Sequence, residues 1–245
     1  MNTTKADRTL IVIPARLQSK RLPDIPLLIH KGKTLLDYTY EQAKKTIAGK
    51  VVVATSDQEI IDYCTDKGLD FVQTVDCTDG TMRCFQAYAQ LISEGYTCVI
   101  NWQVDEPLID VGIVTTMINQ IKEYNQDIFT LVAPITEEQK QNPNITKAIV
   151  PNSFLLGAFV IWNKCHWFTR SPIMENSFGH CGIYGFSNHS LLEVANIRQS
   201  KAAKAEQLEQ LSWIENGIDV KSVLIKELPL SINTPEDWTQ FCNEN

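Results

Sequence analysis

The sequence predicts an α/β fold in which a mostly parallel central sheet carries a smaller antiparallel part. Apolar, β-rich runs, the first over residues 9–14, alternate with segments of helical period, the first over 35–47. Strands that alternate with helices of this length form βαβ units, whose right-handed crossovers make the strands parallel. After residues 128–134 the alternation ends, and apolar runs joined by irregular connections indicate antiparallel strands.

The strands and helices predicted in the first half place several loops at one edge of the sheet. We expect strands over 9–14, 51–55, 71–74 and 97–102, and helices over 35–47, 58–67 and 82–94. Ligands of open parallel sheets bind beyond the carboxyl ends of the strands. The loops expected to line a binding site are therefore those after Ile13, Thr55, Thr74 and Trp102.

The second half predicts irregular strands followed by two helices. The antiparallel candidates are the apolar segments 147–150, 154–162 and 182–186. A helix over 202–216 is expected to end at Gly217, because glycine favours the position just after a helix. The last helix is expected to have Thr234 as its N-cap and Pro235 at its first position.

Composition restricts the class of protein. A chain of 245 residues with 44% hydrophobic content can bury one large core, so we expect a single domain over 1–245. The formal net charge of -7, without a long Lys or Arg run, argues against a nucleic-acid partner. No apolar stretch approaches the roughly 18 residues of a membrane span, and the polar start lacks the centre of a signal peptide. We expect a cytoplasmic protein without membrane insertion.

The cysteines and histidines do not follow a structural-site pattern. Seven cysteines are an odd number and contain no C-x-x-C pair, and the four histidines lack ligand spacing. We expect reduced cysteines and no structural zinc.

The first segment with chemical character is the loop after the N-terminal strand. Residues 13–27 (IPARLQSKRLPDIPL) place Arg16, Lys20 and Arg21 at the carboxyl end of that strand. Arginine forks match phosphate oxygens, and their charge stabilises a departing pyrophosphate. From charge alone, a triphosphate site and a solvated basic loop are equally open interpretations.

The sequence pattern decides between these interpretations, because the chain resembles the 3-deoxy-manno-octulosonate cytidylyltransferases. Residues 13–27 are similar to the family's I-P-A-R-x-x-S-x-R-L-P-x-K-P-L, and residues 101–109 to its N-x-Q-G-D-E-P-x-I. Further matches, in the family's order, are 53–57, 79–83, 142–144, 168–173, 180–184, 208–211 and 234–237. The resemblance implies a Rossmann-like nucleotidyltransferase fold. Roughly residues 135–190 would form an antiparallel insertion that serves the sugar site and the dimerisation of a homodimer.

The same resemblance implies an activity and a set of site residues. CMP would pass from CTP to the anomeric hydroxyl of 3-deoxy-manno-octulosonate (KDO) or its 8-amino analogue, with release of pyrophosphate. The catalytic residues would be Arg16, Lys20, Arg21 and Asp105, and Mg²⁺ would be bound by Asp105 and Asn233. The nucleotide would be bound by Ala15, Arg16, Ser19, Arg21, Ser56, Asp79, Gly80 and Arg83. The sugar would be bound by Gln103, Arg170, His180, Tyr184, Glu209 and Gln210.

Several positions depart from the family's pattern. A phosphate-binding lysine is replaced by Ile25, a metal-binding aspartate by Asn233 and a glycine by Val104. A neutral amide oxygen binds Mg²⁺ more weakly than a carboxylate, and isoleucine carries no charge. The nucleotide loop departs at Cys77, Asp79 and Met82. Three hypotheses follow: an active enzyme with an adjusted substrate, a non-catalytic relative that binds the sugar or sugar nucleotide, and an enzyme for another nucleotide.

Overall fold

The centre of the molecule is a large mixed sheet. The structure, a computed structural model, describes every residue except 1–7, 20, 78, 125–127, 152–161 and 174. Within the described residues the sheet has ten strands, in the order β5-β4-β1-β6-β11-β7-β12-β9, with β8 and β10 attached beside β11. The predicted α/β class with a mostly parallel sheet is confirmed, since β5, β4, β1 and β6 are parallel neighbours and β12 is parallel to β7.

The strands agree with the predicted ranges in the first half of the chain. The parallel strands are β1 (Thr9–Pro14), β4 (Lys50–Thr55), β5 (Phe71–Gln73), β6 (Cys98–Asn101), β7 (Ile128–Ala133) and β12 (Val220–Leu224). The antiparallel strands are β8 (Lys147–Ile149), β9 (Trp162–Lys164), β10 (Trp167–Thr169) and β11 (Ser177–Ser187). A separate small hairpin joins β2 (Ile29–His30) to β3 (Lys33–Thr34).

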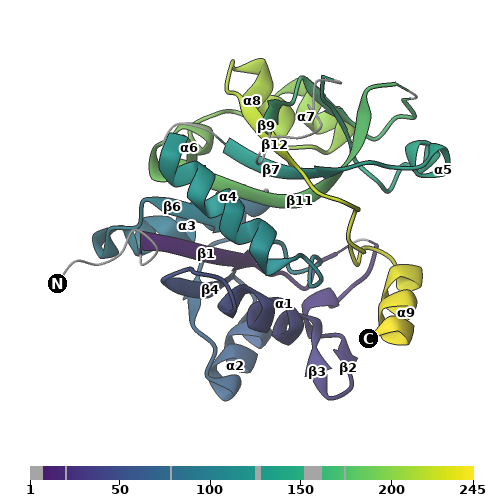
Figure 1. Cartoon of the computed structure of the whole chain (residues 1–245). Helices are drawn as coiled ribbons and strands as arrows, with labels where there is room; N and C mark the ends of the chain where they lie inside the picture. The colour runs from purple at the N-terminus through teal and green to yellow at the C-terminus, as the bar shows by residue number, and fades with distance from the viewer. Residues whose placement is uncertain (1–7, 20, 78, 125–127, 152–161, 174) are drawn as a thin grey trace.

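Helices cover both faces of the sheet (Figure 1). In chain order they are α1 (Leu35–Lys44), α2 (Gln58–Lys67), α3 (Gly80–Gln90), α4 (Val111–Tyr124), α5 (Glu137–Gln141), α6 (Asn188–Ala195), α7 (Lys201–Glu206), α8 (Gln210–Glu215) and α9 (Pro235–Glu244), with 3₁₀ turns η2 (Ile25–Leu27) and η3 (Ile92–Glu94). Alternation along β1 assigns the faces, because successive strand side chains point to opposite sides. Ile11 and Ile13 pack in the core cluster that contains residues of α1, α2 and α4. Leu10 and Val12 pack in the cluster that contains residues of α3, α6 and α8.

The antiparallel strands predicted within 135–190 are integrated into this sheet. The longest, β11, lies between β6 and β7 and runs antiparallel to both. Its register shifts between Cys181 and Tyr184, which marks a β-bulge. The predicted strand over 182–186 is thus the second half of β11, and most of the predicted strand over 154–162 lies outside the described residues.

The predicted helix over 202–216 is wrong as a single element. It is divided into α7 and α8 because Gln207 adopts a left-handed conformation, with φ of 55°. This conformation costs a non-glycine residue about 1 kcal/mol or more. The chain reversal buries Leu208 and Leu211 in the sheet-facing core, which offsets that cost. The sequence analysis also did not predict α4 and β12.

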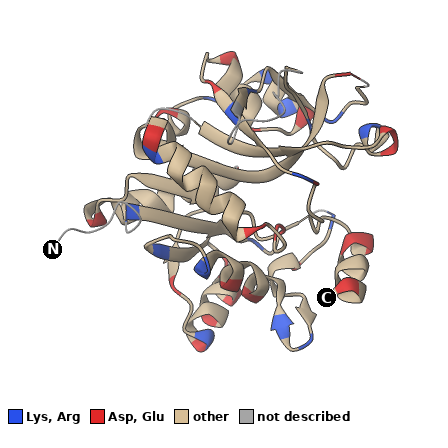
Figure 2. Cartoon of the chain, in the orientation of Figure 1, with Lys and Arg blue, Asp and Glu red and all other residues tan. Residues whose placement is uncertain are grey.

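The expected helix ends are confirmed. Gly217 has a φ of 80° and follows α8, and Thr234 caps α9 in a reciprocal capping box with Asp237. Among the described helices, none combines the length and apolarity needed to cross a membrane. In the view of Figure 2, Lys and Arg are interspersed with Asp and Glu along the ribbon.

Candidate active site

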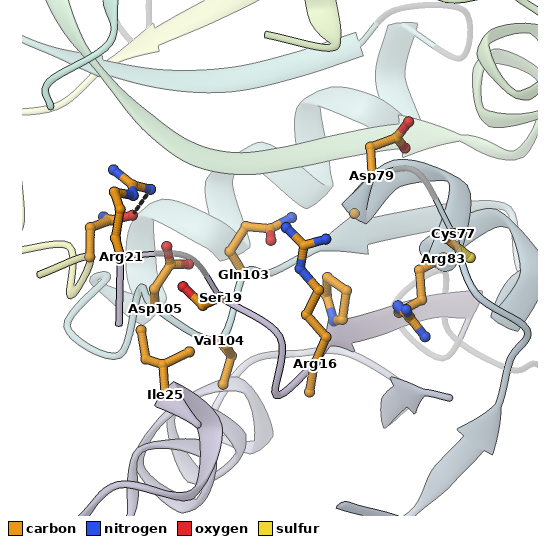
Figure 3. A pocket seen from close by; sticks show the side chains of 14 residues that line it. Arg16, Ser19, Arg21, Ile25, Cys77, Asp79, Arg83, Gln103, Val104 and Asp105 are labelled. Carbon is orange, nitrogen blue, oxygen red and sulfur yellow. Dashed lines mark hydrogen bonds between the residues drawn. The ribbon is translucent and has the colours of Figure 1, made fainter. Parts of the chain in front are cut away.

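A pocket of about 160 Å³ opens at the carboxyl edge of the parallel strands. Of the four loops expected to line a binding site, those after β1, β5 and β6 line it, whereas the loop after β4 does not. The segment before α9 completes the lining (Figure 3). The predicted site residues that the structure brings together on its walls are Ala15, Arg16, Ser19, Arg21, Asp79, Gly80, Arg83, Gln103, Asp105 and Asn233. Two predicted nucleotide or catalytic residues are not on these walls. Ser56 contacts Arg83 but does not line the pocket, and Lys20 lies outside the described residues.

The loop after β1 has a shape set by backbone hydrogen bonds. The Leu17 amide donates to Asp57 Oδ2 at 2.7 Å, and the Asp24 amide donates to the Leu17 carbonyl at 3.1 Å. Asp24 accommodates the tight return with a φ of 55°. The loop thereby leaves the guanidinium groups of Arg16 and Arg21 exposed on the pocket wall, where an anionic ligand can meet them.

Arg83 is a buried arginine of the opposite wall. Only 4% of its surface is exposed, and its Nη1 donates to Thr74 Oγ1 at 2.6 Å and to Ser56 Oγ at 3.2 Å. Ser56 in turn donates to Asp76 Oδ1 at 2.9 Å. Ser56 thus contacts Arg83 and does not itself line the pocket.

Gly80 allows two walls of the pocket to approach each other. A Cβ at this position would lie 2.7 Å from Gln103 Nε2, so a larger residue would require the Gln103 amide to move. Gln103 Nε2 donates to Asn101 Oδ1 at 2.8 Å, which fixes the amide against the first turn of α3. Asp79 caps that turn by accepting from the Met82 amide at 2.8 Å. Aspartate is thus compatible with this position because it is a good N-cap residue.

Two neighbouring carboxyl groups occupy the loop after β6. Asp105 lines the pocket, whereas Glu106 is 4% exposed and points inward. Burial raises the pKa of Asp105, against the opposing charge of Arg21. Burial and the charge of Asp105 raise the pKa of Glu106. Glu106 lies within the motif of residues 101–109 and was not predicted as a site residue, although an acidic residue directly beside Asp105 is a usable signal.

The donors available to a metal are few but suitable. Among the described residues, no three His, Cys, Asp or Glu side chains converge as a ligand group. Asp105 offers a carboxylate, and Asn233 offers an amide oxygen that already accepts from Arg21 Nη2 at 2.6 Å. Mg²⁺ is commonly bound through one or two carboxylates, substrate phosphates and water. This donor set fits a Mg²⁺ ion that shares its coordination with a triphosphate.

The apolar replacements at the pocket base are absorbed by packing. Ile25 is 8% exposed and joins the apolar cluster that contains Ile232 and Phe241. Val104 is 7% exposed, belongs to the main core cluster and is not among the residues with positive φ. Figure 3 shows both side chains below Asp105. The glycine of the family's pattern is therefore not required for backbone conformation here.

The predicted sugar residues are only partly brought to the pocket. Gln103 lines it, while Arg170, His180, Tyr184 and Gln210 do not. Glu209 lines a smaller cavity of about 70 Å³ that shares Asp79 with the main pocket. Gln210 is buried and lines neither cavity.

His180 and Tyr184 form a packed aromatic pair on β11, called the aromatic wall below, which lines neither cavity. Their ring centroids lie 5.3 Å apart, and Tyr184 lies 5.1 Å from Trp213. His180 Nε2 lies 2.8 Å from Thr130 Oγ1. Burial and the nearby Arg170 charge lower the pKa of His180 to about 3, and burial raises the pKa of Tyr184 well above its usual range. Both side chains are thus neutral hydrogen-bonding groups at physiological pH.

Arg170 is held at the end of β10 by its surroundings. Its amide donates to Glu206 Oε2 at 2.9 Å, and its Nη1 lies 3.4 Å from the carbonyl oxygens of Pro143 and Asn144. The buried Lys147 donates to the Arg170 carbonyl at 2.8 Å. These contacts explain how Arg170, distant in sequence from the 142–144 segment, comes to lie against it.

The fold and the family comparisons together define a nucleotidyltransferase. A family model described as cytidylyltransferase matches residues 10–223, and the chain belongs to this family. It is 33% identical to a 3-deoxy-manno-octulosonate cytidylyltransferase of Paramagnetospirillum magneticum, over 93% of this chain and 94% of that protein. It is 34% identical to the protein of the same name from Parvibaculum lavamentivorans, over 95% of this chain and 90% of that protein.

Solved structures agree with this assignment. The fold matches CMP:2-keto-3-deoxy-manno-octonic acid synthetase complexed with CTP with a TM-score of 0.83, at 26% identity and over 96% and 97% of the two chains. A UDP-glucose pyrophosphorylase matches with a TM-score of 0.68 at 12% identity, over 96% and 97% of the chains, which shows the fold alone. The resemblance found in the sequence is confirmed, and the findings support the catalytic hypothesis, not the non-catalytic one.

Proposed function

We propose that the protein transfers CMP from CTP to the anomeric hydroxyl of a 3-deoxy-octulosonate-type acidic sugar, KDO or its 8-amino analogue, and releases pyrophosphate. One observation carries the proposal: Arg16 and Arg21 share a pocket with Asp105 at the carboxyl edge of the parallel sheet. Exposed guanidinium groups suit a triphosphate, and a carboxylate between them and the core suits the metal that accompanies it. The relatives that bear the KDO-transferase name supply the acceptor class.

The chain's own residues would act mainly by position and charge. Arg16 and Arg21 would neutralise the triphosphate and the charge that develops on the departing pyrophosphate. The anomeric hydroxyl would attack the α-phosphorus in line, so no covalent enzyme intermediate is required. Asp105, with the amide oxygen of Asn233, would hold Mg²⁺. When bound, this ion would supply Lewis-acid stabilisation of the reacting phosphoryl oxygens.

The acceptor would lie between Gln103 and the aromatic wall. Neutral His180 and Tyr184 can donate to or accept from sugar hydroxyls without a charge penalty. Arg170 carries the positive charge that a sugar carboxylate needs. Burial lowers the pKa of Arg170, but an arginine side chain stays protonated at physiological pH. A homodimer in the cytoplasm is part of the same proposal, and it is supported by the resemblance of the chain to its family.

The test is a matrix of pyrophosphate-release assays. The purified protein is incubated with Mg²⁺ and each of the four nucleoside triphosphates, with and without KDO or 8-amino-KDO. Release that requires both CTP and one of the sugars is the expected result and names the acceptor. Release with another triphosphate would replace the nucleotide, and the absence of release in every combination would overturn the proposal.

The matched variants are Asp105→Asn and Asp105→Ala. Either should reduce turnover by roughly a hundredfold or more, because each removes the Asp105 carboxylate, whose charge interacts with Arg21 on the pocket wall. Undiminished turnover in both would show that Asp105 holds no metal.

A further inference from the structure

Glu106 is a buried carboxyl group that touches parts of the molecule far apart in the sequence. Its Oε1 accepts from the Gly182 amide at 3.3 Å and also from the Ser231 hydroxyl. Its own backbone is fixed, since the Trp102 indole donates to the Glu106 carbonyl at 2.9 Å. Three segments therefore meet at one side chain, namely the loop after β6, the bulge of β11 and the segment before α9.

The contact with Ser231 bears on the metal donors. Ser231 lies two residues before Asn233, and the intervening Ile232 donates its amide to the Asp105 carbonyl at 2.8 Å. Segment 231–233 is thus joined to the Asp105–Glu106 pair by one backbone and one side-chain hydrogen bond. The separation between Asp105 and Asn233 depends on both.

The contact with Gly182 bears on the aromatic wall. In a regular strand, the Cα atoms of residues four positions apart are separated by about 13 Å along the strand. His180 and Tyr184 instead have ring centroids 5.3 Å apart, because residues 182 and 183 are extra in the register with β7. Thr130 Oγ1 holds this bulge on one side, through the carbonyl oxygens of Cys181 and Ile183. Glu106 holds the amide of Gly182 between them.

We propose that Glu106 is a positioning residue that holds segment 231–233, with Asn233, and the β11 bulge, with His180 and Tyr184, in one fixed relation. It touches neither the nucleotide nor the metal in this role. It acts through hydrogen bonds to its neighbours, so that the metal donors and the sugar-facing wall keep a common spacing. The inference rests on the proposed function, since it concerns the alignment of that function's two halves.

The test compares Glu106→Ala, which removes the acceptor that Gly182 and Ser231 share, with one variant on each side of it. Ser231→Ala breaks the Glu106 contact on the metal side. Thr130→Val leaves both Glu106 contacts in place and removes the hydroxyl that holds the bulge from its other side, where it also bonds His180. Mn²⁺ binding to the protein–CTP complex is measured by water-proton relaxation. KDO binding is measured by titration calorimetry, and folding by thermal unfolding. Neither binding measurement requires turnover.

The expected pattern is selective. Ser231→Ala should weaken Mn²⁺ binding about fivefold, and Thr130→Val should weaken KDO binding about fivefold, as expected for one hydrogen bond. Glu106→Ala should weaken both, each by roughly tenfold or more, as for other residues that orient metal ligands. Glu106→Gln keeps an acceptor oxygen in the same place and should restore both affinities.

Two results would overturn the inference. One is a folded Glu106→Ala protein with unchanged affinities for both probes. The other is equal loss of both affinities in Ser231→Ala and Thr130→Val, which would indicate general loosening of the fold. If Glu106→Ala fails to fold, Glu106→Gln, Ser231→Ala and Thr130→Val decide. If the wild-type protein binds both probes but releases no pyrophosphate, the proposed function fails while the positioning role is still measured.

Discussion

Arg21 Nη2 donates a 2.6 Å hydrogen bond to Oδ1 of Asn233, drawn as the dashed line at Arg21 in Figure 3. The two residues are separated by most of the chain, yet both belong to segments that line the same cavity. The amide oxygen that would serve a metal therefore also orients one of the two exposed arginines. This hydrogen bond joins the proposed metal donor Asn233 to the loop after β1.

Asn233→Asp should strengthen the metal site. A carboxylate binds Mg²⁺ better than an amide oxygen and can still accept from Arg21. We expect the Mg²⁺ concentration for half-maximal rate to fall about tenfold, which corresponds to a gain of about 1.4 kcal/mol in the free energy of Mg²⁺ binding. Turnover should rise. The measurement is a Mg²⁺ titration of pyrophosphate release, with Asn233→Ala as the control that lacks any donor. An unchanged or increased Mg²⁺ requirement in Asn233→Asp would show that Asn233 serves Arg21 alone.

His180 should make the fold less stable in acid. Its pKa is lowered to about 3 in the folded protein, against about 6.5 in an unfolded chain. The unfolded state therefore takes up a proton first, and stability is lost as pH falls from about 6.5 toward 3, with a slope of up to about 1.4 kcal/mol per pH unit.

The measurement is urea unfolding at pH 7.5 and 5.5. His180→Gln keeps a hydrogen-bonding group beside Thr130 but does not titrate. We expect the wild-type protein to lose about 1 kcal/mol more than this variant between the two pH values. Equal losses would mean that His180 can be protonated in the folded protein.

Ile25→Lys should exchange stability for nucleotide binding. Ile25 is buried in an apolar cluster, so its replacement should cost about 1–3 kcal/mol of unfolding free energy. The lysine stem can extend along the pocket base and bring its ammonium group toward the phosphates. We expect the KM for CTP to be about fivefold lower, which corresponds to roughly 1 kcal/mol of binding free energy. Ile25→Met is the control, because it keeps an apolar chain without charge, and an equal gain in that variant would exclude the charge as the cause.

Cys77 should report occupancy of the pocket. It is half-buried on the pocket wall, and Cys242 is the other cysteine that is not fully buried. Bound CTP should slow the alkylation of Cys77 by iodoacetamide while leaving Cys242 unaffected, as measured by mass spectrometry of labelled peptides. Cys77→Ser identifies the peptide, and equal protection of both cysteines would indicate a global effect of CTP.

The pH dependence of that labelling follows from the pKa of the thiol. Burial raises the pKa of Cys77, with the charge of Arg83 opposing. Because the thiolate is the nucleophile, labelling without CTP should be slow at neutral pH and rise about tenfold per pH unit below the pKa. A rate that is independent of pH would contradict a raised pKa.

Local pattern was sufficient for much of the fold. The alternation of apolar runs and helical segments located β1, β4, β5 and β6 to within a residue or two, because strand and helix periods are local properties. The carboxyl-edge rule then located the pocket at the loops after three of those strands. The N-cap at Thr234 was equally readable, since a capping box needs only neighbouring residues.

The missed elements differ in how much local signal they carry. α4 buries Val114, Met117, Ile118 and Ile121 at helical spacing, so its pattern was available and was not used. The break at Gln207 had no such signal, because a non-glycine residue in a left-handed conformation is favoured only by the burial that follows it.

The sequence by itself determined the class of fold, the family and the loops that form the pocket, because these depend on periodicity and on motifs of adjacent residues. Only the tertiary structure decided that β11 lies inside the main sheet, that Asn233 accepts from Arg21 and that Glu106 joins Gly182 to Ser231. The hydrogen bonds of Asn233 and Glu106 join residues that are separated by more than seventy positions. Their geometry follows from the packing of the whole sheet, and no local pattern encodes it.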